Sequence, residues 1–248
     1  MTRVKICGLR DPQIALEAAK AGADFIGLMF AESRRQVSPQ QCHDIVEALA
    51  ETRNGAGLAT FEGPAPGEVR GSSWFGAWNE AIDDALPRFR PLLVGVFADQ
   101  PLEHVNDIAE AANLDLVQLA GAESWDFARR VVRPVLNVLH VHEQTTANDI
   151  FDDLTPGTAA GVLLDTGTAG GARGGTGIAF DWEVAAEVAR RLPFMLAGGL
   201  TPENVAEAIV QVEPWAVDVS SGVETDGVKD IEKIRAFIRA AKGSPRGR

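Results

Sequence analysis

A carboxylate ends a short apolar run of the sequence. Residues 161–164 read Gly-Val-Leu-Leu, a pattern typical of a strand buried on both faces, and Asp165 follows directly. Six of the next twelve residues are glycines, which leave the backbone free to adopt positive φ angles and to bring N–H groups close to a ligand. Such a stretch suits an anion site beside an acid. A flexible glycine-rich surface loop is the alternative interpretation.

A cysteine ends the first apolar run of the chain, as Asp165 ends the run at 161–165. Cys7 ends the run that begins at Val4, and a helix is expected soon after it. A thiol has an ordinary pKa of about 8.5, so it can act as a base near neutral pH if a cation or a helix dipole lowers that pKa. Lys5 and the following helix are the candidates for this effect. The alternative is a small buried hydrophobe, which is how we interpret Cys42.

These two residues belong to a pattern that repeats along the chain. Eight apolar runs are each followed by a junction rich in glycine or capping residues and then by a helical pattern. The runs are 4–7, 24–30, 92–97, 116–119, 135–141, 161–165, 194–197 and 216–219. Near-continuous apolar strands that alternate with helices predict a single α/β domain over residues 1–248, a (βα)8 TIM barrel.

In such a barrel the catalytic residues lie at the carboxyl ends of the strands. The residues that we select for chemistry all lie at or just after the carboxyl ends of expected strands: Cys7, Arg35, Gln118, Asp165, Gly198, Gly199, Ser220 and Ser221. The last four follow strands seven and eight, where these barrels often bind a phosphate through loop amides and a helix N-terminus. The pattern therefore predicts an anionic, phosphorylated ligand at one end of the barrel.

One segment interrupts the repeat. Residues 53–90 connect the second helix to the third strand and are far longer than a usual connection. They are rich in Gly and Pro, and they carry Trp74, Phe75 and Trp78 before a short helix that we expect over 77–86. A helix-to-strand connection lies on the face opposite the active site. We therefore expect this insertion to pack on the barrel or to contact a protein partner.

Composition excludes several classes of function. A net charge of −12 argues against nucleic acid and anionic membranes as partners. Two cysteines do not form a disulfide framework, and no apolar run reaches the length of a membrane span, so we expect a soluble, cytoplasmic protein. His140 and His142 occupy alternate positions at the end of the fifth expected strand. No histidine has a partner at metal-ligand spacing. We expect no metal.

Eight short motifs, in order, make the chain resemble a known family. They are KICG at 5–8, SRRQVSP at 33–39, VGVF at 94–97, VQL at 117–119, LLD at 163–165, GGTG at 174–177 with FDW at 180–182, LAGGL at 196–200 and VDVSSGVE at 217–224. Together they resemble the phosphoribosylanthranilate isomerases of tryptophan biosynthesis. The resemblance covers nearly the whole chain apart from the insertion.

The resemblance implies a cofactor-free Amadori rearrangement of N-(5-phosphoribosyl)anthranilate to 1-(2-carboxyphenylamino)-1-deoxyribulose 5-phosphate, an isomerisation of the aldose-to-ketose type. By motif position, Asp165 is the general acid that opens the ribose ring and Cys7 the general base that removes the C2′ proton. Arg35 holds the anthranilate carboxylate, a task suited to a bidentate guanidinium. The substrate-binding residues that follow by position are Gln118, Gly175, Thr176, Gly177, Gly198, Gly199, Ser220 and Ser221.

The chain departs from the family pattern in two places. The family usually reads Val-Gln-Leu-His-Gly where this chain has Ala120, and Arg-Tyr-Val where it has Gln36. The sister isomerase of histidine biosynthesis resembles the same barrel but has an acid in place of Cys7. A further alternative, based on Ala120 and on the aromatic residues of the insertion, is a catalytically silent barrel that binds a phosphorylated metabolite or a protein.

Overall fold

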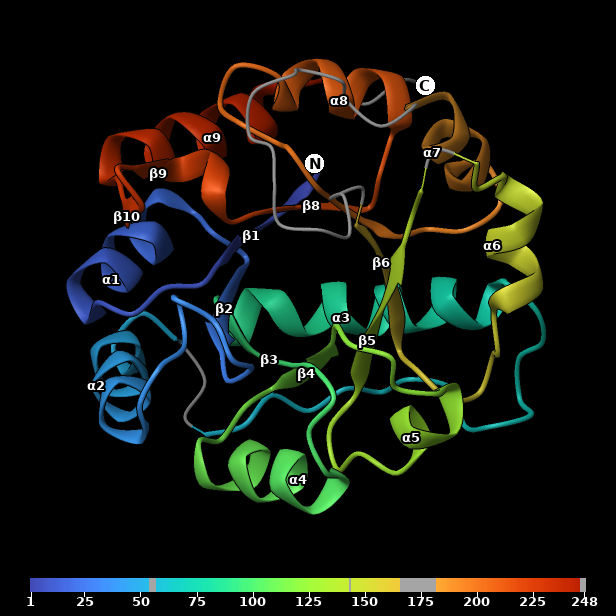
Figure 1. The fold of residues 1–248 in the computed structure, drawn as a ribbon, viewed down its shortest axis with the longest axis horizontal. Coiled ribbons are helices and arrows are strands. Elements are labelled where there is room, and N and C mark those ends of the chain that lie inside the picture. The colour runs from blue at the N-terminus through green and yellow to red at the C-terminus, as the bar shows by residue number, and fades with distance from the viewer. Residues whose placement is uncertain (54–56, 143, 166–181, 246–248) are drawn as a thin grey trace.

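Eight parallel strands close into a barrel surrounded by helices (Figure 1). The computed structural model describes residues 1–53, 57–142, 144–165 and 182–245. The barrel strands are β1 Arg3–Cys7, β2 Phe25–Met29, β3 Leu92–Phe97, β4 Leu116–Leu119, β5 Val135–His140, β6 Gly161–Asp165, β7 Met195–Ala197 and β8 Ala216–Val219. β8 pairs with β1, with Asp218 beside Lys5, and this pairing closes the barrel. The expected (βα)8 fold is confirmed.

The helices begin largely where capping residues occur. Asp11 accepts hydrogen bonds from the amides of Gln13 and Ile14, and Ser38 forms a capping box with Gln41. The helices are α1 Pro12–Ala21, α2 Pro39–Ala50, α3 Ser73–Phe89, α4 Leu102–Ala111, α5 Trp125–Arg129, α6 Ala147–Asp153, α7 Trp182–Ala189, α8 Val205–Val212 and α9 Ile231–Gly243. Apart from α3, they cover the outside of the barrel (Figure 1).

Two short elements follow β8 that the apolar pattern did not indicate. A 3-10 turn, η1 Ser221–Val223, leads into a small hairpin of β9 Glu224–Thr225 and β10 Val228–Lys229. Asp230 then caps α9 by accepting from the amides of Glu232 and Lys233. The last helix therefore begins at Ile231, directly after this cap.

The strands separate two layers of apolar side chains. Phe25, Val94, Leu136 and Val138 belong to the cluster inside the barrel, whereas alternate residues of the same strands pack against the helices. Side chains alternate along a strand, so the inward series on β5 continues from Leu136 and Val138 to His140. The same alternation turns Cys7, Gln118 and Asp165 inward. These side chains therefore point towards the axis at the carboxyl ends of their strands.

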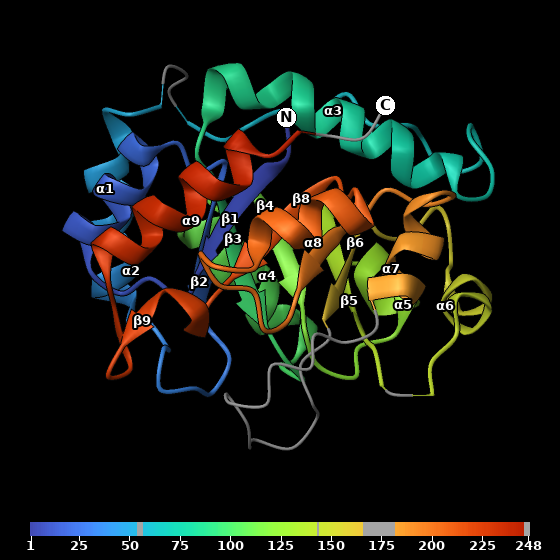
Figure 2. The same cartoon turned by 90° about the horizontal axis from the view of Figure 1, so that it is seen from above.

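Helix α3 lies across the opposite end of the barrel, next to the start of the chain (Figure 2). Trp74 Nε1 donates a 2.6 Å hydrogen bond to the carbonyl of Ala159, just before β6. Asp83 accepts from Arg3 Nη2 at 2.6 Å and from Trp215 Nε1 at 3.2 Å, at the starts of β1 and β8. The helix is longer than the 77–86 expected. It covers the amino ends of the strands, and a protein contact through residues 53–90 stays a prediction.

Trp74→Ala should affect stability far more than catalysis, because the indole is almost fully buried at the end remote from Cys7. We expect urea unfolding to show a loss of roughly 3 to 5 kcal/mol in unfolding free energy. The exposed Val210→Ala serves as a control, with little change expected. A loss of kcat/KM by orders of magnitude in the folded Trp74 variant would contradict the assignment of α3 to a structural role.

Candidate active site

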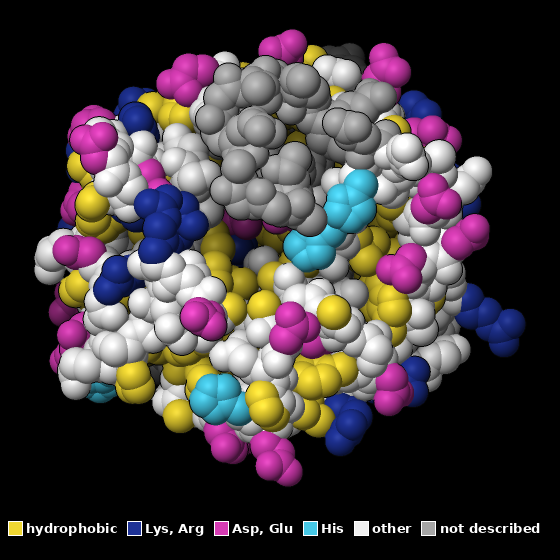
Figure 3. All heavy atoms as spheres, viewed as in Figure 1, with side chains coloured by type: hydrophobic (Ala, Val, Ile, Leu, Met, Phe, Trp, Pro, Cys, Tyr) yellow, Lys and Arg dark blue, Asp and Glu magenta, His cyan; other side chains and the backbone are white. Residues whose placement is uncertain are grey.

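The carboxyl ends of the strands form a face that is hollowed near the barrel axis (Figure 3). β1 and β6 place Cys7 and Asp165 there, β4 places Gln118 there, and Arg35 follows β2. Gly198, Gly199, Ser220 and Ser221 follow β7 and β8. The remaining expected phosphate residues, Gly175, Thr176 and Gly177, lie outside the described residues.

Cys7 is a buried thiol beside a buried cation. Lys5, two residues earlier on β1, is fully buried, and its Nζ lies 3.0 Å from Asp218 Oδ1. Burial raises the pKa of Cys7, and the Lys5 ammonium opposes this only in part. The condition that Lys5 and the following helix lower this pKa is therefore not met, because desolvation of the thiolate outweighs the nearby charge. Lys5 still favours the thiolate once the thiol ionises.

Asp165 lies on the other side of the barrel mouth, at the end of β6. It pairs in register with His140 on β5 and with Ala197 on β7. Burial raises the pKa of Asp218, Lys5 opposes this rise, and the charge of Asp165 adds to it. The acid on β6 is therefore electrostatically linked, through Asp218 and Lys5, to the thiol on β1.

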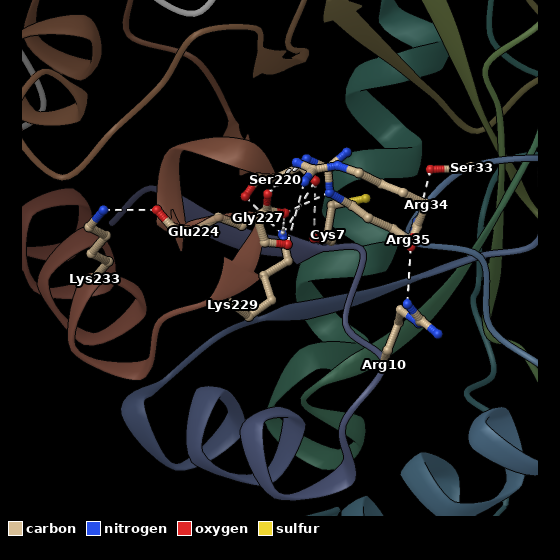
Figure 4. Close-up of polar contacts among 10 residues, drawn as sticks. All are labelled: Cys7, Arg10, Ser33, Arg34, Arg35, Ser220, Glu224, Gly227, Lys229 and Lys233. Atoms are coloured by element: carbon tan, nitrogen blue, oxygen red, sulfur yellow. Dashed lines mark hydrogen bonds and ion pairs between the residues drawn. The ribbon is translucent and has the colours of Figure 1, made fainter.

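Arg35 reaches over the loop after β1. Its guanidinium donates from Nε to Glu224 Oε1 at 2.6 Å and from Nη2 to Glu224 Oε2 at 3.0 Å (Figure 4). Gly8 has a φ of 76°, and a Cβ there would lie 2.6 Å from Arg35 Cδ. A side chain at Gly8 would therefore be strained and would push Arg35 aside. Arg35 is therefore fixed close to Gly8, the residue after Cys7, and its binding of an anion stays a prediction.

Gln118 presents a buried acceptor inside the barrel. Its side chain is 6% exposed, and its Oε1 has no hydrogen-bond partner among the described residues. Leaving a buried polar atom unsatisfied costs roughly 1 to 3 kcal/mol. A ligand or a water that donates to Oε1 would remove this cost. The position suits the substrate contact expected from sequence.

The loops after β7 and β8 lie side by side at the mouth. Gly198 and Gly199 have φ angles of 92° and 62°. This positive-φ conformation favours glycine and can direct backbone N–H groups towards an anion. Ser220 Oγ donates to the carbonyl of Cys7 at 3.3 Å, and Lys229 Nζ donates to the carbonyl of Ser220 at 2.8 Å. A cation thus lies against one expected phosphate loop. Lys229 comes from the hairpin that the apolar pattern did not indicate.

His140 occupies the sector of the mouth next to Ala120. Its Nε2 lies 3.0 Å from the Ala120 carbonyl, so this nitrogen carries the proton and donates. The imidazole comes from β5 rather than from β4, where the family pattern has its histidine.

Ala120→His should change kcat/KM by less than about threefold, because His140 already brings an imidazole to this sector. The measurement is steady-state turnover of wild type and variant side by side. An inert wild type together with an active histidine variant would instead support the silent barrel.

The described part of the chain supports neither a metal site nor a membrane-spanning helix. No group of three or more His, Cys, Asp or Glu residues there could hold a metal ion. None of its helices is long and apolar enough to cross a membrane.

Comparisons with known proteins fit this arrangement of residues. Residues 77–240 match the family model described as N-(5'-phosphoribosyl)anthranilate (PRA) isomerase. A curated N-(5'-phosphoribosyl)anthranilate isomerase from Dehalococcoides mccartyi is 40% identical over 247 residues, which cover 98% of this chain and 96% of the relative. The chain belongs to the PRA isomerase family. The resemblance drawn from the eight motifs is confirmed.

Other PRA isomerases and related proteins extend the comparison. The crystal structure of the enzyme from Thermotoga maritima is 33% identical, with a TM-score of 0.73, and the match covers 98% of this chain and all of that one. A PRA isomerase in complex with reduced 1-(o-carboxyphenylamino)-1-deoxyribulose 5-phosphate is 31% identical, with a TM-score of 0.69 and the same coverage. A multifunctional tryptophan biosynthesis protein from Phycomyces blakesleeanus is 42% identical over 256 residues, and the match covers 97% of this chain and 32% of that protein.

Proposed function

We propose that this chain converts N-(5-phosphoribosyl)anthranilate to 1-(2-carboxyphenylamino)-1-deoxyribulose 5-phosphate, with Cys7 as general base and Asp165 as general acid. One observation carries the assignment of roles. In a member of the PRA isomerase family, a thiol and a carboxyl group point inward from β1 and β6 at the same end of the barrel. The reaction needs one proton donor and one proton acceptor, and these two groups supply them.

The two proton transfers occur in order. The Asp165 carboxyl group protonates the ribose ring oxygen, the C1′–O bond breaks, and the anthranilate nitrogen forms a Schiff base with C1′. The Cys7 thiolate then removes the proton from C2′, and the electron pair moves to give an enolamine. Tautomerisation of the enolamine yields the ketone product. The Lys5 ammonium, which lies beside Cys7 and pairs with Asp218, stabilises the thiolate.

The anionic groups of the substrate bind on either side of the reacting carbons. Arg35 binds the anthranilate carboxylate, and Gln118 Oε1 accepts a hydrogen bond from the substrate. The phosphate binds to the loops that carry Gly198, Gly199, Ser220 and Ser221, with Gly175, Thr176 and Gly177 completing the set expected from the family. A complex of a family member with a reduced product analogue supports a ligand of this class.

Purified protein should consume the substrate with loss of its anthranilate fluorescence. The assay is run with substrate alone, with enzyme, and with enzyme plus the reduced product analogue as inhibitor. We expect enzyme-dependent loss that the analogue suppresses. Tight binding of the analogue with no fluorescence loss would instead identify a silent phosphate-binding barrel.

A further inference from the structure

Glu224 binds the cationic side chains of Arg34, Arg35 and Lys229, although the proposed reaction gives Glu224 no role. Its carboxylate is 5% exposed and accepts from Arg35 twice, from Arg34, and from Lys229 at 3.1 Å (Figure 4). Burial opposes ionisation of this carboxyl group, but the hydrogen bonds from Arg35 and Lys229 prevail and lower the pKa of Glu224 to about 2. Glu224 is therefore ionised at any pH at which the enzyme would be assayed.

The backbone around Glu224 is held from two directions. In the hairpin, Lys229 on β10 pairs with Glu224 on β9. From the first turn of α9, Lys233 Nζ donates to the Glu224 carbonyl at 2.8 Å. The carboxylate thus projects from a fixed support rather than from a free loop, and it can fix the side chains that bind to it.

The contact uses only one edge of the Arg35 guanidinium. A guanidinium has five N–H donors in one plane, and Nε with one N–H of Nη2 forms the edge that Glu224 occupies. The second edge, made of Nη1 and the other N–H of Nη2, has the same spacing and suits a second carboxylate. A lysine has no such pair of edges. Arg35 can therefore hold Glu224 and an anionic ligand at the same time.

We propose that Glu224 is a positioning residue, which holds one edge of Arg35 so that the other edge faces the anthranilate carboxylate. The inference rests on the proposed function, in which Arg35 binds that carboxylate. Glu224 itself does not touch the substrate. Its charge also balances part of the positive charge of Arg34, Arg35 and Lys229, so that these cations can lie together.

Glu224→Gln is the first test. The amide keeps the size of the side chain but loses the charge and can accept from only one oxygen, so Arg35 becomes loosely held. We expect KM to rise about tenfold and kcat to fall less than about threefold. The matched control is Glu17→Gln, which removes a carboxylate that pairs with Arg235 at 2.6 Å and with Lys20 at 3.2 Å on α1. The control should leave both constants unchanged.

Glu224→Asp separates position from charge. The shorter side chain keeps the charge but withdraws the carboxylate by one methylene, so a positioning role predicts a higher KM here too. If only the charge mattered, Glu224→Asp would match wild type and Glu224→Gln would bind anions more tightly, because a negative charge is gone. Either of these results would overturn the proposal.

A double-mutant cycle shows whether Glu224 acts through Arg35. In an Arg35→Ala background, Glu224→Gln should cause no further rise in KM. Inhibition by inorganic phosphate should stay within about twofold of wild type in the Glu224 variants, because the expected phosphate contacts do not include the Glu224 carboxylate. Phosphate inhibition that weakens in parallel with KM would indicate a general collapse of the mouth and would contradict the proposal.

A direct measurement of ligand binding tests the positioning role without relying on turnover. Free anthranilate is titrated against wild type and Glu224→Gln, with its fluorescence as the signal. Weaker anthranilate binding by the variant supports the positioning role even if wild type shows no isomerase activity, which would refute the proposed function alone. Equal binding by the two proteins would overturn the positioning role in an active enzyme as well.

Discussion

Cys7→Ser is expected to lower kcat by about 10²- to 10⁴-fold, the range typical of a lost general base. A hydroxyl group is far harder to deprotonate than a thiol, so removal of the C2′ proton should nearly stop. Cys7 is buried, and serine is close enough to cysteine in size to fit the same space, so the fold should persist. The measurement is steady-state turnover together with titration of the reduced product analogue, whose affinity should stay within a few-fold of wild type.

Asp165→Asn should cause a loss of similar size, because an amide cannot deliver a proton to the ring oxygen. In wild type, kcat/KM should rise and fall with pH, and the limbs belong to the pair of groups until variants assign them. Burial raises the pKa of Cys7, so the limb that reports the thiol should lie on the alkaline side, above about pH 8.5. In Asp165→Asn the residual rate should rise with pH through that range, as the thiolate forms. A residual rate that falls there would contradict the role of Cys7 as base.

Arg35→Ala is expected to weaken substrate binding by roughly 2 to 5 kcal/mol, the range for truncating one partner of a buried charge pair. The variant loses the anthranilate contact and also leaves Glu224 with fewer cations. KM should therefore rise steeply, while kcat at saturating substrate falls much less. Arg10→Ala, which removes an exposed arginine that donates to the Arg34 carbonyl, is the control.

Equal losses in kcat and kcat/KM for Arg35→Ala would contradict a binding role. They would show that the guanidinium interacts with the transition state and not with the bound substrate. Unchanged affinity for free anthranilate would lead to the same conclusion.

The barrel could be predicted from the sequence because parallel strands buried on both faces are apolar throughout. The runs 92–97, 116–119 and 161–165 each match an observed strand residue for residue. Cys7 and Asp165 were found because each polar or reactive residue stands at the end of such a run. Alternation along the strands then fixes their inward direction without knowledge of any contact.

Other features depend on contacts that a sequence pattern does not contain. The pairing of Arg35 with Glu224 joins residues 189 positions apart and requires the hairpin of β9 and β10. The pKa of Cys7 depends on how completely the barrel excludes water, so the sequence neighbour Lys5 was a poor guide to its direction. The start of α8 is a further example: Thr201 and Pro202 have the sequence of a helix cap, but residues 202–204 form a turn and the helix begins at Val205.

The most direct test of the central claim is a crystal structure of the protein with the reduced product analogue bound. We expect the carbon corresponding to C2′ to lie within about 3.5 Å of Cys7 Sγ, close enough for proton transfer. We also expect the oxygen derived from the ribose ring to face Asp165 and the carboxylate to bind to the Arg35 edge formed by Nη1 and Nη2. A ligand whose C2′ faces away from Cys7, with its carboxylate far from Arg35, would contradict the roles of Cys7 as base and Arg35 as carboxylate-binding residue.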